Sequence, residues 1–589
     1  MNLGSSDVGA LKKAGNTTSI RNAERDLLGL FRKEGLTLPF TMSQVTFNPG
    51  QVVHYISLKD WFKYLLSKRP DYLLGGFRNE ESSARCLLRS FWHRFRELYP
   101  DHSVFELHGE RLEQCLPFYL HLDEGVGQRR SGVLIMAFQA LWGRETRQRF
   151  NDLYSQGQHY SQAEVDDLMG QAQYHNAGGS TYCTRFLFTA MAKKQYQGKK
   201  GGNSNVYHGM LQILAQEGTE LMTRGLWVGD RQFYLCALGL KGDQPALVKA
   251  GSFTRSFMNL GFGKLSCWEC LAGDLQFPFE DCRRDPKWAA TIGLVEPWDP
   301  AKQSPLLKIP ARQDQPQAFF KRDAFHAFKQ TIGGHFAAST IVLLMLEFSF
   351  WHVAGASNAV EALFARAFED WSFWIKHEWK KKVVNHCKMF TRELFHFKGN
   401  DSFPTCRFKG SDQMLLQRWL NHLVLNGPII PDRDVCRAGV SLLSQPLEQW
   451  HLPFLKAILN ACQGSTQFFH LVHRQGVWLE KATAHDMSES CLKFCQAYSW
   501  LAKACHEKRW ARYHLEPSLH TFMHFSVELR QGLESGATLI LSPAVHTTEM
   551  DEDFVGKICR LSRCTHGSTT NPRTIERYMV KCCLEFGDA

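Results

Sequence analysis

Hydrophobic residues recur at helical spacing in the first part of the chain. Residues 23–33, 58–66 and 86–98 each carry an apolar stripe, and in the last of them the arginines fall mostly off the apolar side. Residues 1–20 are rich in Gly, Ser, Asn and Thr, which predicts a disordered start. We therefore expect a small helical region with a disordered beginning over residues 1–110.

The pattern changes to short apolar runs between residues 111 and 320. Runs that predict strands lie at 117–122, 132–142, 182–191 and 233–240, with a helix expected at 206–224. The Gln-rich stretch after the second run has no assigned element, and a Gly/Lys loop is expected at 197–204. Three strands, a helix and a further strand predict a mixed α/β sheet with helices on its faces.

The strand pattern disappears in the next part of the chain, where Trp, Phe, Leu and Lys recur at helical spacing. We expect an all-helical domain over residues 321–535, inserted between the first part of the sheet domain at 111–320 and its last part at 536–589. A short apolar run at 537–541 and a helix from Glu549 open that last part. The apolar run at 341–346 is too short to span a bilayer, so no membrane partner is expected.

Composition narrows the class of protein. The chain has 589 residues, 44% hydrophobic and 22% charged, which excludes a wholly disordered, collagenous or coiled-coil protein. Its net charge of +11 suits a polyanionic partner, although many proteins with neutral ligands carry as much. Basic residues alternate with aromatic ones at 87–96 and 371–382, a pattern found in nucleic-acid-binding surfaces and in ordinary solvated faces alike.

Eighteen cysteines are scattered along the chain. The first residues show no apolar stretch after a basic start, so a secretory signal is not expected. We therefore expect the cysteines to be reduced core residues or metal ligands, in a soluble protein of a reducing compartment inside the cell.

Two aspartates occupy the same local position. Asp123 follows the first predicted strand and Asp243 follows the fourth. Functional groups gather at the carboxyl ends of strands in open α/β sheets, and paired carboxylates bind hard divalent cations. The alternative is that both residues only end strands and begin turns.

A zinc site is suggested by two pairs of residues. Cys267 and Cys270 form a Cys-x-x-Cys pair, which supplies half of a tetrahedral site. His520 and His524 share one face of a helix and can supply the other half. Taken alone, such a histidine pair is more often helix surface.

Further acids and a histidine lie at helix starts. Asp323 and His326 share a helix face and could bind a metal or simply begin the helix. An acidic cluster opens the last helical segment, where the helix dipole favours acids, yet one of them could complete a metal site with the two aspartates. The cluster comprises Glu549, Asp551, Glu552 and Asp553.

In this order the motifs resemble those of DDE transposases of the CACTA type and their Plavaka-like relatives. The stretch from Tyr207-His208 to Asp243-Gln-Pro-Ala resembles that family's helix, strand and Asp-x-Pro-Ala element. Its Cys-x-x-Cys, Asp-x-x-His and His-x-x-x-His motifs match the pairs named above, and its Glu-Arg-Tyr-x-Gly helix resembles Glu552 to Gly556. The resemblance covers residues 115–565, and its specificity comes from the collinear set.

The resemblance implies a ribonuclease-H-like α/β fold with a mixed sheet, interrupted by the large helical insertion. Asp123, Asp243 and Glu552 would be catalytic carboxylates that hold two Mg²⁺ or Mn²⁺ ions. Cys267, Cys270, His520 and His524 would hold a structural Zn²⁺ ion, and Asp323 and His326 would be an accessory pair. It further implies DNA as the substrate, nuclear localisation and self-association as an oligomer.

The sequence departs from the family pattern in places. Asp553 stands where the family has Arg, and Glu576-Arg577-Tyr578 matches those three letters better but is followed by Val580 where Gly is expected. Glu576 is therefore a rival third carboxylate. No N-terminal zinc finger or clear helix-turn-helix precedes the motifs. The expected function is a transposase-derived DNA-cleaving and strand-transfer enzyme; the alternative is an inactive, domesticated nucleic-acid-binding protein or a zinc-braced scaffold.

Overall fold

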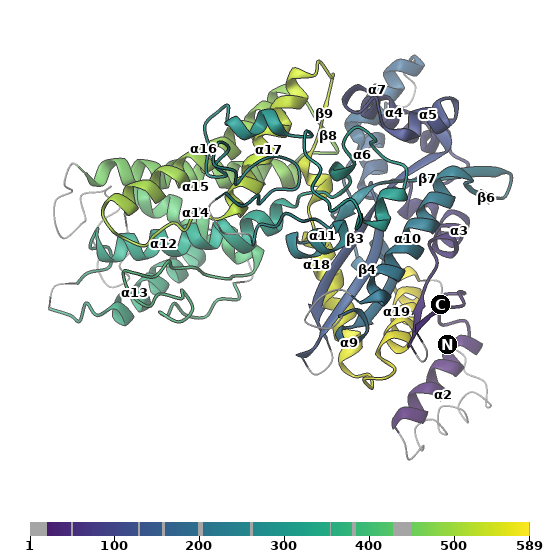
Figure 1. The fold of residues 1–589 in the computed structure, drawn as a ribbon, viewed down its shortest axis with the longest axis horizontal. Helices are drawn as coiled ribbons and strands as arrows, with labels where there is room; N and C mark the ends of the chain where they lie inside the picture. Colours follow the sequence, from purple (N-terminus) through teal and green to yellow (C-terminus); the bar gives the residue numbers. More distant parts are fainter. Residues whose placement is uncertain are drawn as a thin grey trace. The chain divides into compact units, whose positions relative to one another are not determined.

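A computed structural model of the chain describes residues 20–48, 51–127, 130–155, 159–197, 204–258, 263–353, 355–379, 385–427 and 450–587. The chain divides into two compact units. Unit 1 comprises Met1–Phe253, Trp298–Lys321 and Thr548–Ala589, and unit 2 comprises Thr254–Pro297 and Arg322–Thr547. Figure 1 shows the elements of both units.

Unit 1 is a mixed α/β structure, so the coarse fold class expected from the sequence is confirmed. Its strands are β1 (Ser43–Asn48), β2 (Gln51–Tyr55), β3 (Cys115–Val126), β4 (Gly132–Ala140), β5 (Phe186–Ala192), β6 (Leu226–Val228) and β7 (Arg231–Lys241). Its α-helices are α2 (Ile20–Lys33), α3 (Leu58–Lys68), α4 (Ser82–Leu98), α5 (Ser103–His108), α6 (Glu145–Leu153), α7 (Gln162–Ala172), α8 (Thr181–Thr184), α9 (Lys193–Tyr196), α10 (Asn205–Thr223), α11 (Gln244–Gly251), α18 (Glu549–Arg563) and α19 (Thr570–Phe586). Short 3₁₀ turns lie at η1 (Pro70–Tyr72), η2 (Gly109–Gln114), η6 (Pro305–Lys308) and η7 (Pro316–Phe319).

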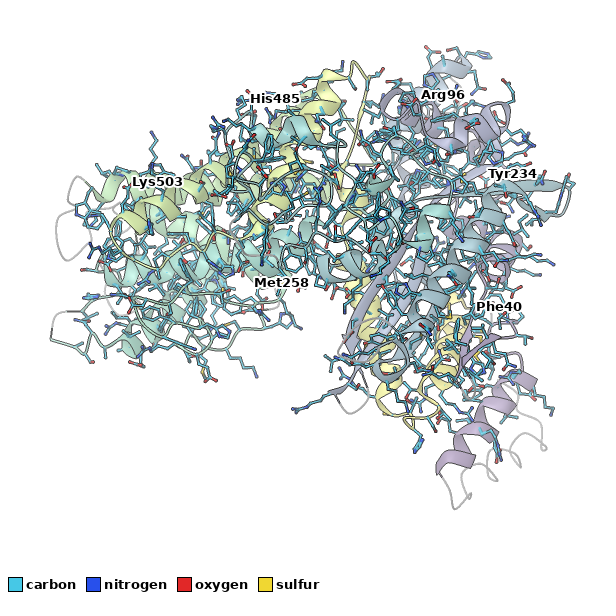
Figure 2. All side chains as sticks on the ribbon, viewed as in Figure 1. Phe40, Arg96, Tyr234, Met258, His485 and Lys503 are labelled. Atoms are coloured by element: carbon cyan, nitrogen blue, oxygen red, sulfur yellow. The ribbon has the colours of Figure 1, made fainter. Side chains whose placement is uncertain are left out.

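A five-stranded sheet in the order β5-β4-β3-β7-β6 forms the centre of unit 1 (Figure 1). β3 pairs antiparallel with β4 and parallel with β7, while β4–β5 and β6–β7 are antiparallel. The first nine residues of β3 are all buried, as expected for a central strand covered on both faces. Tyr234 of β7, labelled in Figure 2, lies against the ring of His108 at 3.9 Å between centroids.

The two faces of the sheet are covered by different helices. On one face, Phe62 of α3 packs against Phe118 of β3 and Phe138 of β4. Glu217 of α10 accepts hydrogen bonds from Leu58 N (2.6 Å) and the Ser57 hydroxyl (3.1 Å), which joins α10 to the start of α3. Side chains at odd-numbered positions of β3 face the other way, and there α18 covers the strand.

Gly125 of β3 allows α18 to lie close to the sheet. A Cβ at this position would lie 2.4 Å from the Sγ of Cys559 and 2.8 Å from a methyl carbon of Val555, both on α18. These distances are shorter than van der Waals contact, so a larger residue would push α18 away from β3. The absence of a side chain at Gly125 therefore sets the distance between this helix and the strand.

Gly125→Ala is expected to destabilise unit 1 by about 1–3 kcal/mol, the usual cost of overpacking a core. The matched control is Gly556→Ala on α18, where a Cβ would meet only the Arg560 guanidinium at 3.8 Å. Because alanine favours the helix over glycine by up to about 1 kcal/mol, the control should be unchanged or slightly stabilised. Thermal melts of both variants measure the difference, and equal melting temperatures would contradict the proposed close packing.

Unit 2 consists mainly of helices. They are α12 (Gly333–Leu346), α13 (Val360–Phe373), α14 (Gly410–Asn426), α15 (His451–Arg474), α16 (Lys481–Glu507) and α17 (Pro517–Glu534), with shorter turns η5 (Lys287–Thr291), η8 (Phe325–Ile332), η9 (Trp374–Glu378) and η10 (Pro543–His546). Phe328, Phe469, Phe494 and Phe522 form an aromatic cluster among them. None of the helices in the described part of the chain has the length and apolar composition that crossing a membrane requires.

Several elements differ from the sequence-based expectations. The N-terminal region is not purely helical, because β1 and β2 form an antiparallel hairpin there. The helical block is not free of strands either: β8 (Trp478–Leu479) pairs with β9 (Ile540–Leu541), which is shorter than the strand expected at 537–541. Most of the disordered start and of the loop expected at 197–204 lie outside the described residues.

The third expected strand, 182–191, is also partly wrong. Its beginning is the helical turn α8, and the strand β5 starts only at Phe186. The Gln-rich stretch without an expected element contains α7, whose Ser161 and Glu164 form a capping box. The boundaries expected from the sequence for the sheet domain and the helical insertion remain predictions.

Candidate functional site

Asp123 and Asp243 lie on neighbouring parallel strands at the same level of the sheet. His121 of β3 is paired with Lys241 of β7, and each aspartate follows its paired residue by two positions. The chain still lies against β3 after β7 ends, because a Cβ at Gly242 would be 2.4 Å from the carbonyl oxygen of Leu122. Neighbouring strands are about 4.8 Å apart, so the register brings the two aspartates close to each other.

Asp123 does not end its strand, contrary to the expectation. β3 continues to Val126, and Asp123 pairs with Ile135 of β4 inside the ladder. The carboxylate of Asp123 is buried, and its Oδ1 accepts a hydrogen bond from Glu124 N at 2.6 Å. Asp123 shares a face of β3 with Gly125, so it faces α18.

Asp243 begins a helix. It is the N-cap of α11, and its Oδ1 accepts a hydrogen bond from Ala246 N at 2.7 Å. An aspartate at this position stabilises the helix start, which agrees with the alternative interpretation of this residue. Burial, and after it the charge of Asp243, raises the pKa of Tyr207 on α10.

Glu552 is the member of the acidic cluster that meets Asp123. A carboxylate oxygen of Glu552 and one of Asp123 lie within 4.8 Å of each other. Burial raises the pKa of Cys559 to about 12, with the charges of Asp123 and Glu552 among the further causes. Both carboxylates therefore lie near Cys559 on α18.

The rival acids have other partners. Asp553 accepts a hydrogen bond from the Thr181 hydroxyl (2.6 Å) and pairs with Lys557 (2.9 Å). Glu576 pairs with Arg573 at 2.6 Å and lies on α19. Glu549 is the first residue of α18, where an acid favours the helix dipole. These contacts explain Asp553 and Glu576 as structural residues.

Asp551 forms a buried ion-pair network that the sequence analysis missed. Its side chain is fully buried, 3.1 Å from Lys241 Nζ of β7 and 3.4 Å from Arg185 Nε beside β5. Burial alone would raise the pKa of Asp551, but the charges of Lys241 and Arg185 hold it well below its ordinary value. The network fixes the first turn of α18, and with it Glu552, against the sheet. The sequence does hold a hint of this network, because Arg185 and Lys241 directly flank the apolar runs at 186–192 and 233–240 and a buried cation needs an acidic partner.

Asp551→Asn is expected to destabilise the protein by about 3–5 kcal/mol at neutral pH, because it removes the buried negative charge that pairs with Lys241 and Arg185. The folded-state pKa of Asp551 lies below the unfolded value of about 3.9, so its stabilisation is present above that pH and is lost as the pH falls through the folded pKa. The gap in melting temperature between the wild type and the variant should thus be constant from about pH 5 to 7 and should narrow below about pH 4.

Asp553→Asn is the neighbouring control for this measurement. Its carboxylate is partly exposed, and exposed pairs contribute about 1 kcal/mol or less. A gap for Asp551→Asn as small as that of Asp553→Asn would show that the buried network does not fix α18.

Four side chains converge inside unit 2 as expected for a zinc site. Cys270 Sγ lies 3.3 Å from His520 Nε2, Cys267 Sγ lies 3.5 Å from His524 Nε2, and the two imidazole nitrogens are 3.0 Å apart. All four are buried, and all four ligand atoms lie within 4.8 Å of one another. In a tetrahedral zinc site, ordinary bond lengths put sulfur and nitrogen about 3.6 Å apart and two nitrogens about 3.3 Å apart. The donor set therefore fits this metal.

Two of these ligands have pKa shifts that suit a metal, whereas burial raises the pKa of the Cys270 thiol well above its ordinary value. Burial would raise the pKa of the Cys267 thiol, but hydrogen bonds from Cys270 and the histidines and the charge of His524 bring it well below its ordinary value. Burial, followed by the charge of Arg322, lowers the pKa of His524 to about 3. A thiolate and a neutral imidazole are the forms that bind zinc.

Buried groups around the cluster hold its ligands in place. Arg322 pairs with Glu269, inside the Cys-x-x-Cys turn, and with Glu528 on α17. The ring of Trp288 lies 4.3 Å from His520 and 4.7 Å from His524 between centroids. This second layer joins the cysteine turn to the histidine helix.

Asp323 and His326 form a local pair at a helix start in unit 2. Asp323 accepts hydrogen bonds from the backbone N–H groups of Phe325 (3.0 Å) and His326 (3.1 Å), and its Oδ2 is 2.6 Å from His326 Nδ1. Backbone bonds of this kind are typical of a residue that begins a helix. The structure therefore brings the two residues together as expected and gives Asp323 a structural role.

Of the two basic stretches expected to suit nucleic acid, the first has arginines engaged in ion pairs. At 87–96, Arg89 pairs with Asp166 and Glu113, and the nearly buried Arg94 pairs with Asp167. At 371–382, Trp371 and Trp374 belong to the core, and residues 380–382 lie outside the described residues. In the described residues, Arg89 and Arg94 of the first stretch and Trp371 and Trp374 of the second therefore have structural roles.

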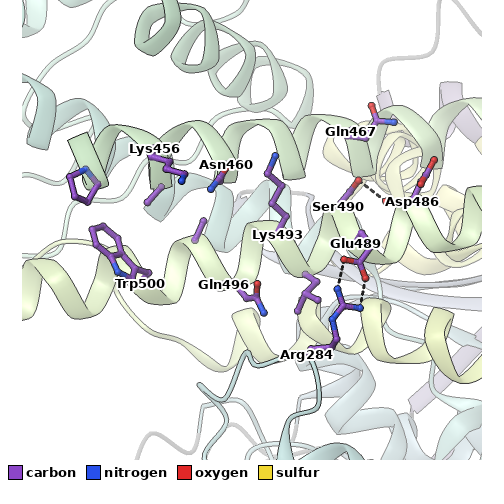
Figure 3. A pocket seen from close by; sticks show the side chains of 14 residues that line it. Arg284, Lys456, Asn460, Gln467, Asp486, Glu489, Ser490, Lys493, Gln496 and Trp500 are labelled. Carbon is purple, nitrogen blue, oxygen red and sulfur yellow. Dashed lines mark hydrogen bonds and ion pairs between the residues drawn. The ribbon is translucent and has the colours of Figure 1, made fainter. Parts of the chain in front are cut away.

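An open groove of about 780 Å³ between α15 and α16 also carries cations (Figure 3). Arg284 forms two hydrogen bonds with Glu489, at 2.7 and 2.6 Å, and Lys493 Nζ donates to the side chain of Gln463 at 2.8 Å. Asp486 and Glu489 add negative charge to the same groove. Since Arg284, Lys456 and Lys493 stand against these two acids, the groove has only a small excess of positive charge and adds little support for phosphate binding.

Comparison with known proteins gives no family for this chain. A scan against protein-family models finds no match, and a search of curated proteins finds none either.

Proposed function

We propose that this chain is a transposase-derived enzyme that cleaves DNA and transfers strands, with a ribonuclease-H-like core in unit 1. The core is supported by three antiparallel strands in chain order, β3, β4 and β5, followed by α10 and then β7 parallel to β3. Unit 2 would be the helical insertion, since it interrupts the segments of unit 1 along the chain. The short strand β6 is an addition at the edge of this arrangement.

One observation carries the proposal: the carboxylates of Asp123 on β3 and Glu552 on α18 come together, and the register places Asp243 just beyond the neighbouring strand β7. Asp123 and Asp243 share a level of adjacent strands, and Glu552 lies within 4.8 Å of Asp123. Carboxylate oxygens are the ligands that Mg²⁺ and Mn²⁺ prefer, so the donor set fits these ions. The ion pairs of Asp551 position Glu552 by fixing its helix turn.

Two such ions would supply an activated water or 3′-hydroxyl and stabilisation of the leaving oxygen. The chain's own carboxylates would hold these ions rather than the phosphodiester itself, because carboxylates and phosphodiesters are both anionic. Asp243 would contribute the oxygen that does not cap α11, and Asp123 the oxygen that does not accept from Glu124 N. In unit 2, Cys267, Cys270, His520 and His524 would hold a structural Zn²⁺ ion that braces the insertion. DNA as the partner, self-association and nuclear localisation follow from this function.

A second candidate is an inactive, domesticated nucleic-acid-binding protein or a zinc-braced scaffold. Asp243 already has a structural role as a helix cap, and two arginines of the basic stretch at 87–96 are engaged in ion pairs. On this interpretation the aspartates stabilise the fold and the Cys/His cluster organises unit 2.

The test uses the purified full-length chain and supercoiled plasmid DNA, with Mg²⁺ or Mn²⁺ and with a chelator as the control. Metal-dependent nicking supports the enzyme. Salt-sensitive DNA binding without nicking supports the inactive nucleic-acid-binding protein, because phosphate contacts weaken steeply as salt rises. Failure to bind DNA at moderate salt supports the scaffold.

A further inference from the structure

A second cluster of metal-type ligands lies in unit 2. Glu516 Oε1 is 3.3 Å from His335 Nε2 and 3.0 Å from His514 Nδ1. One ligand atom of each residue lies within 4.8 Å of those of the other two. His335 is on α12, while His514 and Glu516 belong to the connection between α16 and α17.

The backbone around this cluster is fixed by its own contacts. Tyr513 adopts a positive φ of 53°, its N–H donates to the Ser339 hydroxyl at 2.9 Å, and its hydroxyl lies 3.1 Å from that of Thr340. The hydroxyl of Tyr498 donates to the carbonyl oxygen of His514 at 2.7 Å. Ser339 and Thr340 lie on α12, so the connection is held against the helix that carries His335. These contacts therefore hold His335, His514 and Glu516 in place before any metal ion binds.

We propose that His335, His514 and Glu516 bind a divalent transition-metal ion, with Zn²⁺ as the first candidate and water in the remaining position. Two imidazoles and one carboxylate form a known zinc-binding set, which leaves one position open. With zinc bond lengths and tetrahedral angles, neighbouring ligand atoms are about 3.4 Å apart, close to the two distances in this cluster. The side chains of Glu516 and His514 are 25% and 34% exposed, so water can reach the open position.

The ion would join α12 to the start of α17. Glu516 immediately precedes α17, which carries His520 and His524 in its first two turns. Phe403 stacks on the ring of His514 at 4.7 Å and covers one side of the cluster. The helix α17 would thus be tied to two metal ions, one at the Cys/His cluster and one at Glu516. The second ion would have no sulfur ligand. This site does not depend on the proposed DNA chemistry.

The first test measures zinc bound per chain after the full-length protein is loaded with Zn²⁺ and freed of excess metal. We expect two equivalents in the wild type and one in His335→Gln and in Glu516→Gln, with zinc affinity at this site reduced at least about 100-fold, since loss of an outer-shell partner alone costs 10–100-fold. Glu516→Gln leaves the cap of α17 intact, because the Glu516 side chain makes no capping hydrogen bond. The matched control, His485→Gln (Figure 2), changes a 61% exposed histidine of α16 and should keep both equivalents.

A second measurement needs no variant. X-ray absorption at the zinc edge counts the mean number of sulfur ligands per zinc in the wild type. Binding at the Cys/His cluster alone gives two sulfurs per zinc, whereas equal binding at both sites gives one. A single zinc equivalent, a sulfur count of two, or variants that keep both equivalents would overturn the proposal and leave the three residues as a hydrogen-bonded group.

Discussion

Asp243→Asn is expected to abolish metal-dependent DNA nicking while leaving the melting temperature of the protein unchanged. Asparagine caps a helix as well as aspartate does, so the hydrogen bond to Ala246 N and the start of α11 should survive. The substitution removes the negative charge that a divalent cation needs. We expect the rate of nicking to fall at least about 1,000-fold, or about 4 kcal/mol of transition-state stabilisation. Plasmid nicking rates and thermal melts of the same preparations measure both effects.

The controls separate catalysis from structure. Asp230→Asn changes an exposed aspartate in the turn before β7, at the opposite end of that strand from Asp243, and should keep full activity. Asp123→Asn and Glu552→Gln should be as inactive as Asp243→Asn, whereas Glu576→Gln should be active. If Asp243→Asn nicks DNA normally while Asp123→Asn does not, Asp243 is only a helix cap and the three-carboxylate site is wrong.

Cys270→Ser is expected to bind one zinc equivalent fewer than the wild-type chain and to destabilise unit 2 by at least about 4 kcal/mol. Loss of a structural metal is among the few changes that destabilise a protein by this much, because the remaining buried ligands lose their partner. For a unit of this size the melting temperature should fall by roughly 10 °C. Metal analysis and a thermal melt of unit 2's transition measure the two effects.

Cys462→Ala serves as the matched control for this substitution. Cys462 is a fully buried thiol on α15 whose pKa is raised by burial alone, to a value above the ordinary range. Its replacement should keep the full zinc content and lower stability only by the loss of packing. Full zinc content in Cys270→Ser would show that the Cys/His cluster does not hold the metal.

The central strands of unit 1 could be predicted because burial on both faces makes a strand apolar throughout. The runs at 117–122 and 233–240 became β3 and β7 with small changes at their ends. The end of β3 could not be predicted, since Glu124 and Val126 are exposed while their backbones still pair with β4. The hairpin of β1 and β2 was missed because its residues are mostly partly exposed and lie between strongly periodic helices.

Some of the candidate sites could likewise be predicted from the sequence, and others could not. Cys267, Cys270, His520 and His524 were found because each pair has a short spacing that metal sites use. The ion pairs of Asp551 join residues far apart in the sequence, 366 positions in the case of Arg185. No local pattern encodes such a partner. The group formed by His335, His514 and Glu516 was missed for that reason too.

The division of unit 1 into separate segments has a consequence for its biosynthesis. Glu552 leaves the ribosome about 300 residues after Asp243, which corresponds to roughly 15–60 s at ordinary rates of translation. During that interval the odd-numbered face of β3 has no α18 to cover it, and Lys241 and Arg185 lack the Asp551 carboxylate. The nascent sheet is therefore expected to need chaperone protection, and the carboxylates of Asp123 and Glu552 come together only when synthesis is nearly finished.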